Sequence, residues 1–337
     1  MNVTGRFFDY ICEDMNSFGR KFRVEVFGES HGPAVGAVID GVAAGFPLDV
    51  ADFASDTARR APSAEGTTAR REDDVPEILS GVRDGFTTGT PIAILFRNSD
   101  VRSGDYSTFT DIPRPGHADY AAIARWGEYA DIRGGGHFSG RLTLPLVAAG
   151  VVAKKSLALR SRISICAEVA ELGGSADSCQ WNGLIQSAMA DGDSLGGIVS
   201  CRVSNLPAGI GEPFWDSVES LISHAVFAIP GVRGIEFGDG FKAAAMRGSA
   251  HNDPLGPDGP VQNGAGGVNG GLTNGAPLCF RVAFKPASSI SRPQRTYDFK
   301  EKRMTELVVS GRHDCCFVQR TPVIVEAATA IVLADIL

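Results

Sequence analysis

The sequence has no apolar run long enough to cross a membrane. The longest candidate, residues 142–153, is followed at once by Lys154 and Lys155, and a spanning helix needs about 20 apolar residues. The N-terminus carries acidic residues where a secretory signal would be basic and then apolar. We therefore expect no membrane anchor and no export.

Cysteine is scarce, and neither charge sign dominates strongly. The seven cysteines form no CxxC pair and no zinc-like spacing, so a reducing cytoplasm fits better than a disulfide framework. The formal net charge of −7 argues against a protein that holds nucleic acid by a general basic field. No two histidines fall at HxH, HxxH or HxxxH spacing, so we expect no metal site.

Glycine and arginine are present in excess. Glycine makes up 41 of the 337 residues, in clusters without a collagen period, which predicts many loops with positive φ or close backbone approach. Arginine outnumbers lysine by 25 to 7, and its planar fork suits carboxylates and phosphates. Codon bias in a GC-rich genome explains that ratio equally well, so the positions of the arginines have to decide.

Strand and helix patterns alternate without a regular βαβ order. The expected strands cover residues 22–26, 35–39, 199–203 and 278–284, and the expected helices cover 120–130, 142–159, 213–229 and a closing segment that starts at Pro322 after an N-cap at Thr321. This mixture predicts an α+β fold with antiparallel sheets. Residues 55–75 are polar and charge-dense and are expected to form a surface loop or lid. No linker divides the chain, so we expect one domain over residues 18–337 after an N-terminal extension of residues 1–17.

Three polar clusters carry residues suited to proton transfer. His31 follows Gly28-Glu29-Ser30 at the tip of an expected hairpin, and His117 lies in RPGHAD, where Asp119 can orient its ring. Arg312-His313-Asp314 places a cation, an imidazole and a carboxylate side by side, and an arginine neighbour favours the ionised carboxylate. Each cluster alone is more simply a tight turn, but their joint presence in glycine-containing loops favours a ligand site.

The arginines near the glycine clusters indicate an anionic ligand. They are Arg59, Arg60, Arg70, Arg71, Arg114, Arg133, Arg141 and Arg312. A converging set would bind a small polyanion such as a phosphorylated carboxylic acid, and a solvated surface is the alternative. Residues 285–289 (KPASS) end an expected strand and resemble a phosphate cradle, whereas the Walker A and GxGxxG patterns are absent. The residues alone predict an enzyme or binder for a small anionic ligand, with a phosphate-bearing cofactor.

Taken together, nine segments resemble the chorismate synthase family from about residue 18 to residue 337. They are FGESHG (27–32), SGVRDGFTTGTPIAILFRN (80–98), RPGHADY (114–120), DIRGGG (131–136), GIGEPFWD (209–216), PGVRGIEFGDGF (230–241), AGGVNGGLTNG (265–275), KPASSI (285–290) and GRHDCC (311–316). Each segment alone is a weak signal, but their joint occurrence in this order is specific.

The resemblance implies a reaction and a fold. The family is a carbon–oxygen lyase of the shikimate pathway: 5-enolpyruvylshikimate 3-phosphate loses phosphate and a ring proton by 1,4-anti elimination to give chorismate. It requires reduced FMN, which gives electron density to the substrate and accepts the ring hydrogen at N5. The resemblance further implies a β-α-β sandwich and a homotetramer, with NADPH or an external flavin reductase as the source of reduced flavin.

The family's functional residues carry over by motif. His31 would protonate or stabilise the reduced flavin, His117 would protonate the departing phosphate, and Asp314 would assist the flavin as base. The implied substrate-binding residues are Ser30, Arg60, Arg114, Ser139, Arg141 and Arg312. The implied FMN-binding residues are His137, Phe138, Ser139, Pro230, Gly231, Gly270, Lys285, Pro286, Ala287, Ser288, Ser289 and Arg312.

Several positions depart from the family pattern. His137 and Phe138 stand where an Arg and a Ser contact FMN, and Leu142 replaces a Glu. The loop around residues 59–68 lacks its later Arg, with Glu65 or Gly66 near that place; Cys315 replaces a Pro, and Ala287 replaces a Thr. An active enzyme with weakened flavin affinity is the favoured interpretation. The alternative is a divergent, non-catalytic flavin- or anion-binding paralogue on the same fold.

Overall fold

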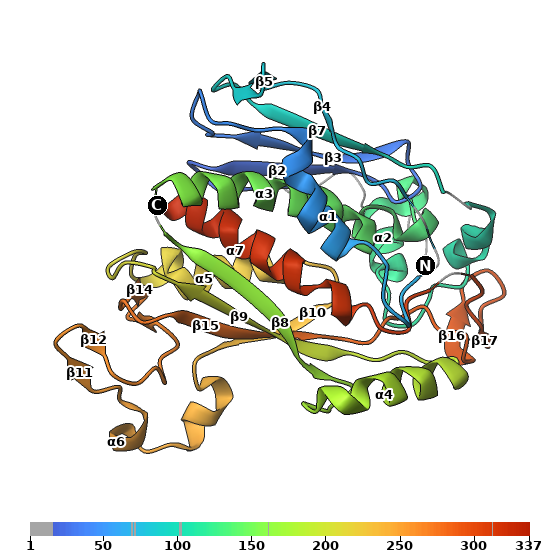
Figure 1. Ribbon diagram of the computed structural model, residues 1–337. Coiled ribbons are helices and arrows are strands. Elements are labelled where there is room, and N and C mark those ends of the chain that lie inside the picture. Colours follow the sequence, from blue (N-terminus) through green and yellow to red (C-terminus); the bar gives the residue numbers. More distant parts are fainter. Residues whose placement is uncertain (1–15, 69, 71, 101–102, 161, 312) are drawn as a thin grey trace.

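The computed structural model describes residues 16–337, apart from residues 69, 71, 101–102, 161 and 312. Two antiparallel sheets enclose a layer of helices (Figure 1). The five-stranded sheet has the order β1 (Ser17–Phe18), β2 (Arg23–Gly28), β3 (Ala34–Asp40), β7 (Ile92–Arg97) and β4 (Glu77–Ile78). The four-stranded sheet has the order β10 (Val232–Phe237), β15 (Leu278–Phe284), β9 (Gly197–Ser204) and β8 (Ser164–Leu172). The predicted α+β sandwich with antiparallel sheets is confirmed.

The two long helices of this layer, residues 143–160 and 322–336, are mostly apolar because nearly all of their described side chains are buried, whereas the two shorter helices each keep an exposed, more polar face. The layer consists of α1 (Ala54–Arg60), α3 (Thr143–Arg160), α5 (Val218–Phe227) and α7 (Pro322–Ile336). Every residue of α7 from Val323 to Asp335 is buried, as expected for a helix that is apolar all round. Helices α3 and α7 cross closely at Gly150, where a Cβ atom would lie 2.3 Å from the Cβ of Ala327.

The predicted hairpin at the N-terminal end of the fold is confirmed, and it positions His31. Strands β2 and β3 pair with Val24 opposite Ile39 and Gly28 opposite Val35. Gly28 ends β2 with φ +101°, and a Cβ atom there would lie 2.4 Å from the carbonyl oxygen of Ala34. Only glycine can make this close turn, which directs the tip of the hairpin toward the centre of the molecule.

Other predicted boundaries need correction. Residues 55–60 belong to α1, so the predicted surface loop starts only after that helix. Helix α5 begins at Val218 rather than at Pro213, because the Ser217 side chain accepts the Ser220 N–H as its N-cap. Helix α7 does start at Pro322, but Thr321 makes no side-chain cap bond to it and donates to the carbonyl oxygen of Val318 instead.

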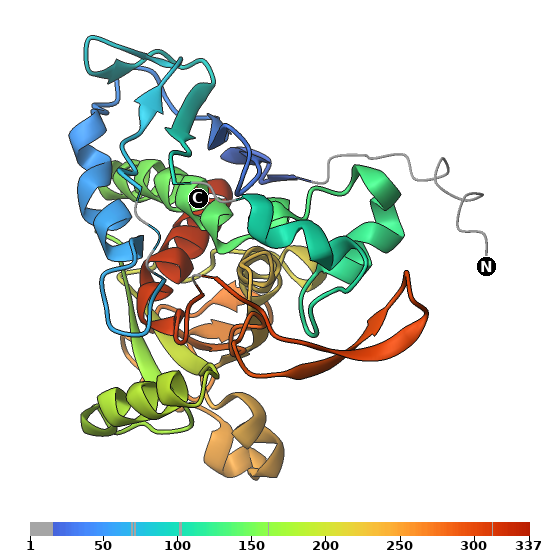
Figure 2. The same cartoon turned by 90° about the vertical axis from the view of Figure 1, so that its right-hand side faces the viewer.

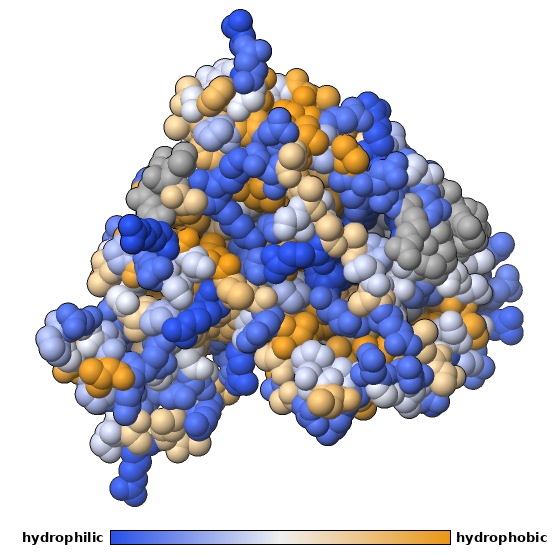
Figure 3. All heavy atoms as spheres, viewed as in Figure 1, coloured by the Kyte–Doolittle hydropathy of each residue, from blue (hydrophilic) through white to orange (hydrophobic). Residues whose placement is uncertain are grey.

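The remaining elements lie around this sandwich. They are α2 (Asp119–Trp126), α4 (Ser178–Ala190), α6 (Gly248–His251), β5 (Val82–Arg83), β6 (Phe86–Thr87), β11 (Leu255–Gly256), β12 (Gly259–Pro260), β13 (Val268–Asn269), β14 (Leu272–Thr273), β16 (Gln294–Asp298) and β17 (Arg303–Leu307). The β16–β17 hairpin extends away from the body of the molecule (Figure 2). Residues 238–276 form a lobe of mixed hydrophilic and hydrophobic surface (Figure 3). Among the helices of the described residues, none is long and apolar enough to span a bilayer.

Candidate active site

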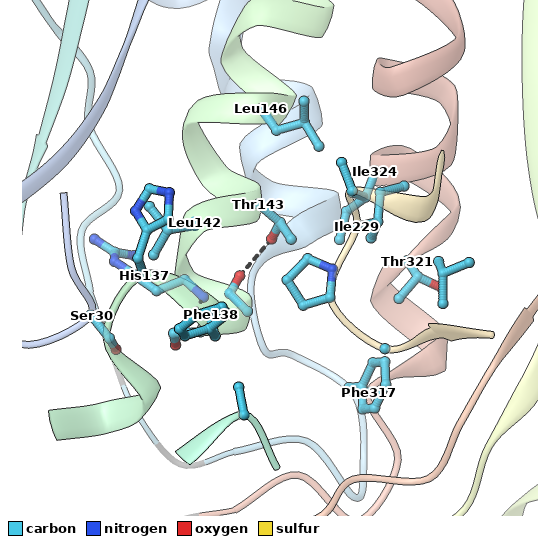
Figure 4. Close-up of a pocket in the computed structure, with 18 of the residues that line it drawn as sticks. Ser30, His137, Phe138, Leu142, Thr143, Leu146, Ile229, Phe317, Thr321 and Ile324 are labelled. Atoms are coloured by element: carbon cyan, nitrogen blue, oxygen red, sulfur yellow. Dashed lines mark hydrogen bonds between the residues drawn. The ribbon is translucent and has the colours of Figure 1, made fainter. Parts of the chain in front are cut away.

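A cavity of 960 Å³ lies where the hairpin tip, the ends of α3 and α7, and several loops meet. This volume is at the upper end of the range for small-molecule sites, about 300–1,000 Å³. Its wall has two chemically different parts. The apolar half contains Leu142, Leu146, Ile229, Phe317 and Ile324, which Figure 4 labels together with polar residues of the wall such as Ser30 and His137. The polar half contains the histidines, arginines and carboxylates described below.

The cavity is cationic although the chain is acidic. Among the described residues, its wall has seven Lys or Arg side chains and four carboxylates, whereas the whole chain has a net charge of −7. The cations are Arg60, Arg70, Arg114, Arg141, Arg233, Lys285 and Arg320. The carboxylates are Glu72, Asp74, Asp100 and Asp314. Such a local excess of positive charge in a concave site attracts anions.

His117 is held by a buried carboxylate at the start of α2. Its Nδ1 lies 2.6 Å from Oδ1 of Asp119, and Arg114 donates to the same carboxylate from Nε at 2.7 Å. Burial of Asp119 disfavours its charge, but hydrogen bonds from Arg114 and His117 outweigh it and hold the pKa of this carboxyl well below its usual range. Because Asp119 accepts only, the network assigns the proton of His117 to Nδ1.

The second nitrogen of His117 is directed at the glycine-rich loop. A Cβ atom at Gly135 would lie 3.4 Å from Nε2 of His117. Gly134 leaves similar room for His31, since a Cβ atom there would lie 2.4 Å from the ring carbon Cδ2. The ring of His31 also meets Tyr106 edge-on, with the centroids 5.0 Å apart. The glycines of DIRGGG therefore allow the backbone to approach both imidazoles.

Asp314 is fixed by one backbone and one side-chain donor. Its Oδ1 accepts the N–H of Thr68 at 2.9 Å, and its Oδ2 accepts Nη2 of Arg320 at 2.6 Å. Arg320 was missed by sequence reasoning, because it lies in QRTP outside the motifs. Its side chain is 15% exposed and forms part of the cavity wall.

Arg60 and Arg141 are buried arginines that share one carboxylate. The side chains of Arg60, Arg141 and Asp74 are 5%, 4% and 8% exposed. Arg60 Nη1 lies 3.4 Å from Oδ2 of Asp74, and Nη1 of Arg141 donates to Oδ1 of Asp74. Burial and the neighbouring Arg320 and Arg141 lower the pKa of Arg60 to about 9, which still leaves it charged at neutral pH. Sequence reasoning also missed Asp74.

The KPASS segment packs against the RPGHAD loop. Nζ of Lys285 and Oγ of Ser288 both donate to the carbonyl oxygen of Gly116, each at 2.7 Å. Arg114 reaches the same segment and donates from Nη1 to Oγ of Ser289 at 3.0 Å. Burial and the nearby Arg233 lower the pKa of Lys285. The predicted phosphate cradle and the His117 loop are therefore parts of one wall.

His137 and Phe138, which differ from the family pattern, are also part of the cavity wall. The ring nitrogen Nδ1 of His137 lies 2.8 Å from the carbonyl oxygen of Gly28, and Nε2 lies 3.2 Å from Oδ1 of Asn16. Phe138 is 40% exposed and lies 5.8 Å from Trp126 between ring centroids. These contacts attach the glycine-rich loop to the β1–β2 end of the five-stranded sheet and to α2.

The cavity wall brings together most of the predicted site residues. They are Ser30, His31, Arg60, Arg114, His117, His137, Phe138, Ser139, Arg141, Pro230, Gly231, Lys285, Pro286, Ala287, Ser288, Ser289 and Asp314. Gly270 is not among them, since it forms the turn between β13 and β14. That turn packs beside α5, where Val218 N–H donates to the carbonyl oxygen of Gly271. Arg312 lies outside the described residues.

Comparisons with known proteins agree with the fold. The family model for chorismate synthase matches residues 22–337. A chorismate synthase of Chitinophaga pinensis is 54% identical over 323 residues, which cover 95% of this chain and 96% of the relative. A chorismate synthase of Korarchaeum cryptofilum is 45% identical over 347 residues, covering 94% and 96%. A crystal structure of chorismate synthase superposes with a TM-score of 0.72 at 26% identity, covering 95% of this chain and 92% of that chain.

The chain belongs to the chorismate synthase family, because the family model and close relatives match it over nearly its whole length. Its function is that family's shikimate-pathway lyase activity, on a small anionic substrate.

Proposed function

We propose that the cavity converts 5-enolpyruvylshikimate 3-phosphate to chorismate and phosphate by 1,4-anti elimination. The observation that carries this proposal is the position of the His117–Asp119 pair in the same cationic wall as Arg60, Arg114 and Arg141. A substrate with one phosphate and two carboxylates needs several converging cations. Its phosphate also needs a proton donor as it leaves.

His117 is proposed as the acid for the leaving phosphate. Asp119 accepts from Nδ1, which leaves Nε2 as the nitrogen from which a proton would be donated toward the cavity. Arg114 also donates to Asp119, and this bond fixes the carboxylate and hence the plane of the imidazole. The arrangement follows the general logic of a histidine oriented by a buried carboxylate.

Arg60, Arg114, Arg141 and Ser139 are proposed to bind the substrate's anionic groups, with Arg312 and Ser30 as further members. The three described arginines are nearly fully buried: counted over the whole residue, Arg60, Arg114 and Arg141 are 4%, 4% and 5% exposed. Buried guanidinium groups interact with an anion far more strongly than solvated ones.

The described residues fit FMN. The apolar half offers a surface for a planar ring, and the ammonium group of Lys285 with the backbone N–H groups of residues 287–289 offers donors for a phosphate. Gly231 has φ +93°, and a Cβ atom there would lie 2.8 Å from the ring of Phe317. Only glycine therefore allows the backbone of this turn to pack so closely against the Phe317 ring. Reduced FMN, when bound, supplies the electron density and the hydrogen acceptor that the elimination requires.

The protein's own residues would support that chemistry in defined ways. His31 is proposed to hold a proton beside the cofactor, and Asp314, fixed by Thr68 N–H and Arg320, to act as the carboxylate beside the reacting hydrogen. NADPH or an external flavin reductase is proposed as the source of the reduced cofactor.

Residues 18–337 are proposed to act as one catalytic domain within a homotetramer. Several large apolar side chains are unusually exposed for a single chain: Phe214 is 84%, Trp215 88% and Phe241 85% exposed. Large apolar side chains that are exposed on one chain are often covered by a partner in an assembly. Light scattering coupled to gel filtration tests this: the mass of a tetramer is expected, and a monomer at micromolar concentration would contradict it.

The activity itself is tested by anaerobic turnover with dithionite-reduced FMN, followed by chorismate absorbance. We expect chorismate to form, and His117→Ala to lower kcat by about 10²–10⁴-fold, the usual contribution of a general acid. Folded protein that makes no chorismate at saturating FMN would contradict the proposal. Binding of FMN without turnover would instead identify a non-catalytic flavin-binding paralogue.

A further inference from the structure

Asp74 lies at the centre of the arginine cluster. Its two carboxylate oxygens are divided between the guanidinium groups of Arg60 and Arg141. All three side chains are at most 8% exposed. The arginines come from different parts of the chain, the C-terminal end of α1 and the 3-10 helix η5 (Gly140–Leu142). Two like charges this deeply buried repel each other, so a shared carboxylate is what allows them to lie together.

The backbone at Asp74 is held in an uncommon conformation. Its φ is +50°, a left-handed value that non-glycine residues seldom adopt and that clusters at functional sites. On one side, Glu72 accepts the N–H and the hydroxyl of Ser99 at 2.8 and 2.7 Å. On the other side, Glu77 and Ile78 form β4 and pair with β7. Contacts of the segments before and after Asp74 therefore fix its backbone position.

The C-terminal end of β7, the strand that pairs with β4, also binds the side chain of Arg141. Arg141 Nε donates to Oδ1 of Asn98 at 2.9 Å, and Nη2 donates to the carbonyl oxygen of Arg97 at 3.3 Å. Asp74 is thus tied through β4 to the end of β7, which also supplies two acceptors for its partner. The Asp74 carboxylate and the Arg141 guanidinium are therefore held in fixed positions relative to each other by contacts with the same strand.

Both arginines keep N–H groups for a ligand. A guanidinium has five N–H donors. Arg60 donates to Thr143 Oγ1, to Asp74 and to the carbonyl oxygen of Gly140. Arg141 likewise donates to three acceptors of the described residues. Each arginine thus has two N–H groups with no acceptor among the described residues, both arginines line the cavity, and Asp74 helps to fix the planes of their guanidinium groups.

We infer that Asp74 is a positioning residue for substrate binding: it orients Arg60 and Arg141 toward the substrate's anionic group without touching the substrate. This inference rests on the proposed role of the two arginines in anion binding. A positioning residue of this kind acts mainly on KM, because the arginines bind the anion in the ground state as well as in the transition state.

The test is steady-state kinetics of Asp74→Asn at saturating reduced FMN. Asparagine keeps the shape of the side chain and tolerates positive φ, so the substitution removes mainly the charge. We expect KM for the substrate to rise about tenfold or more, since the partner arginines lose their buried counter-ion. We expect kcat to change less than about threefold. The Kd of inorganic phosphate, measured by calorimetry, should rise in parallel, and Asp74→Glu should recover part of the loss.

A matched control and a second variant keep the test decisive. Asp84 has φ +53° and a side chain that is 88% exposed, so Asp84→Asn makes the same change at the same backbone conformation outside the cavity and should leave KM unchanged. If Asp74→Asn folds poorly, Asp74→Gly accepts the left-handed backbone without strain and removes the same carboxylate.

The outcomes separate this inference from the proposed function. A lower melting temperature with unchanged KM would show a purely structural role, and tighter phosphate binding would show that Asp74 competes with the ligand; either overturns the inference. If Arg60→Ala and Arg141→Ala raise KM while Asp74→Asn does not, only the inference fails. If the arginine variants also leave KM unchanged, the proposed anion site itself is wrong.

Discussion

The two halves of the cavity are built by different forces and from different kinds of segment. The apolar half comes from the first turns of α3 and α7 and from Leu142, Ile229 and Phe317, which lie next to helices; α3 and α7 also form much of the core. The polar half comes from loops whose side chains are fixed by buried ion pairs, such as Arg114 with Asp119. The apolar half therefore depends on packing, and the polar half on charge and hydrogen-bond direction. We expect substitutions in the two halves to change different kinetic constants.

The largest effect outside His117 itself is expected from Asp119→Asn. The substitution removes the charge that orients His117 and pairs with Arg114, so kcat should fall by about 10²-fold or more. The Kd of FMN should change little, because Asp119 does not touch the apolar half. If Asp119→Asn lowered only the affinity for FMN and left kcat unchanged, the proposed difference in role between the two halves would be wrong.

The same variant has a defined effect on stability. The pKa of Asp119 is depressed in the fold, so its contribution to stability is present above the unfolded value of about 3.9 and is lost as pH falls through the folded value. Breaking this buried pair should cost about 3–5 kcal/mol. Thermal melts should show the same deficit at about pH 6 and about pH 8, shrinking only below about pH 4.

Leu146→Ala tests the apolar half, with Leu144→Ala as the matched control. Leu146 is in the cavity wall, and Leu144 on the same helix is fully buried in the core. Removing three carbon atoms of the Leu146 side chain, at about 0.8 kcal/mol per buried methylene, should weaken FMN binding by up to about 60-fold and leave kcat at saturating FMN nearly unchanged. Leu144→Ala should lower stability by about 2–5 kcal/mol without the specific change in FMN affinity. Fluorescence titration and denaturant unfolding measure the two effects.

The smallest effect is expected at Phe138, a position that differs from the family pattern. Its ring is 40% exposed and contacts Trp126. Phe138→Ser should change the Kd of FMN by only a few-fold, because an exposed aromatic contact contributes about 0.5–1.5 kcal/mol. Tighter FMN binding by the variant, in a fluorescence titration, would show that the ring crowds the cofactor. A change larger than about 30-fold would mean that Phe138 is a main part of the flavin site.

Most of the proposed site residues could be picked out from the sequence, because their types and motif contexts are local. His117 with Asp119, and Lys285 with Ser288, each lie within a few positions of one another. Their meeting in one cavity was implied only by the family resemblance, since it depends on the packing of two sheets around α3 and α7.

Arg320 was missed although its partner Asp314 is only six residues away, whereas Asp74 was missed because its contacts are made over long distances in the chain. Asp74 meets Arg141 across 67 residues, and it does so through a φ of +50° that no sequence pattern indicates. The start of α5 was wrong for a related reason. Pro213 and Ser217 are both acceptable helix starts, and the side chain of Ser217 makes the cap.

The most direct test of the distinction between the halves is a paired measurement on His117→Ala and Leu146→Ala. For each variant, kcat at saturating reduced FMN and the Kd of FMN would be measured on the same preparation. The account predicts that His117→Ala loses kcat and keeps FMN affinity, whereas Leu146→Ala loses FMN affinity and keeps kcat. If both variants lose both properties to similar extents, the cavity does not consist of two separable halves and the account is contradicted.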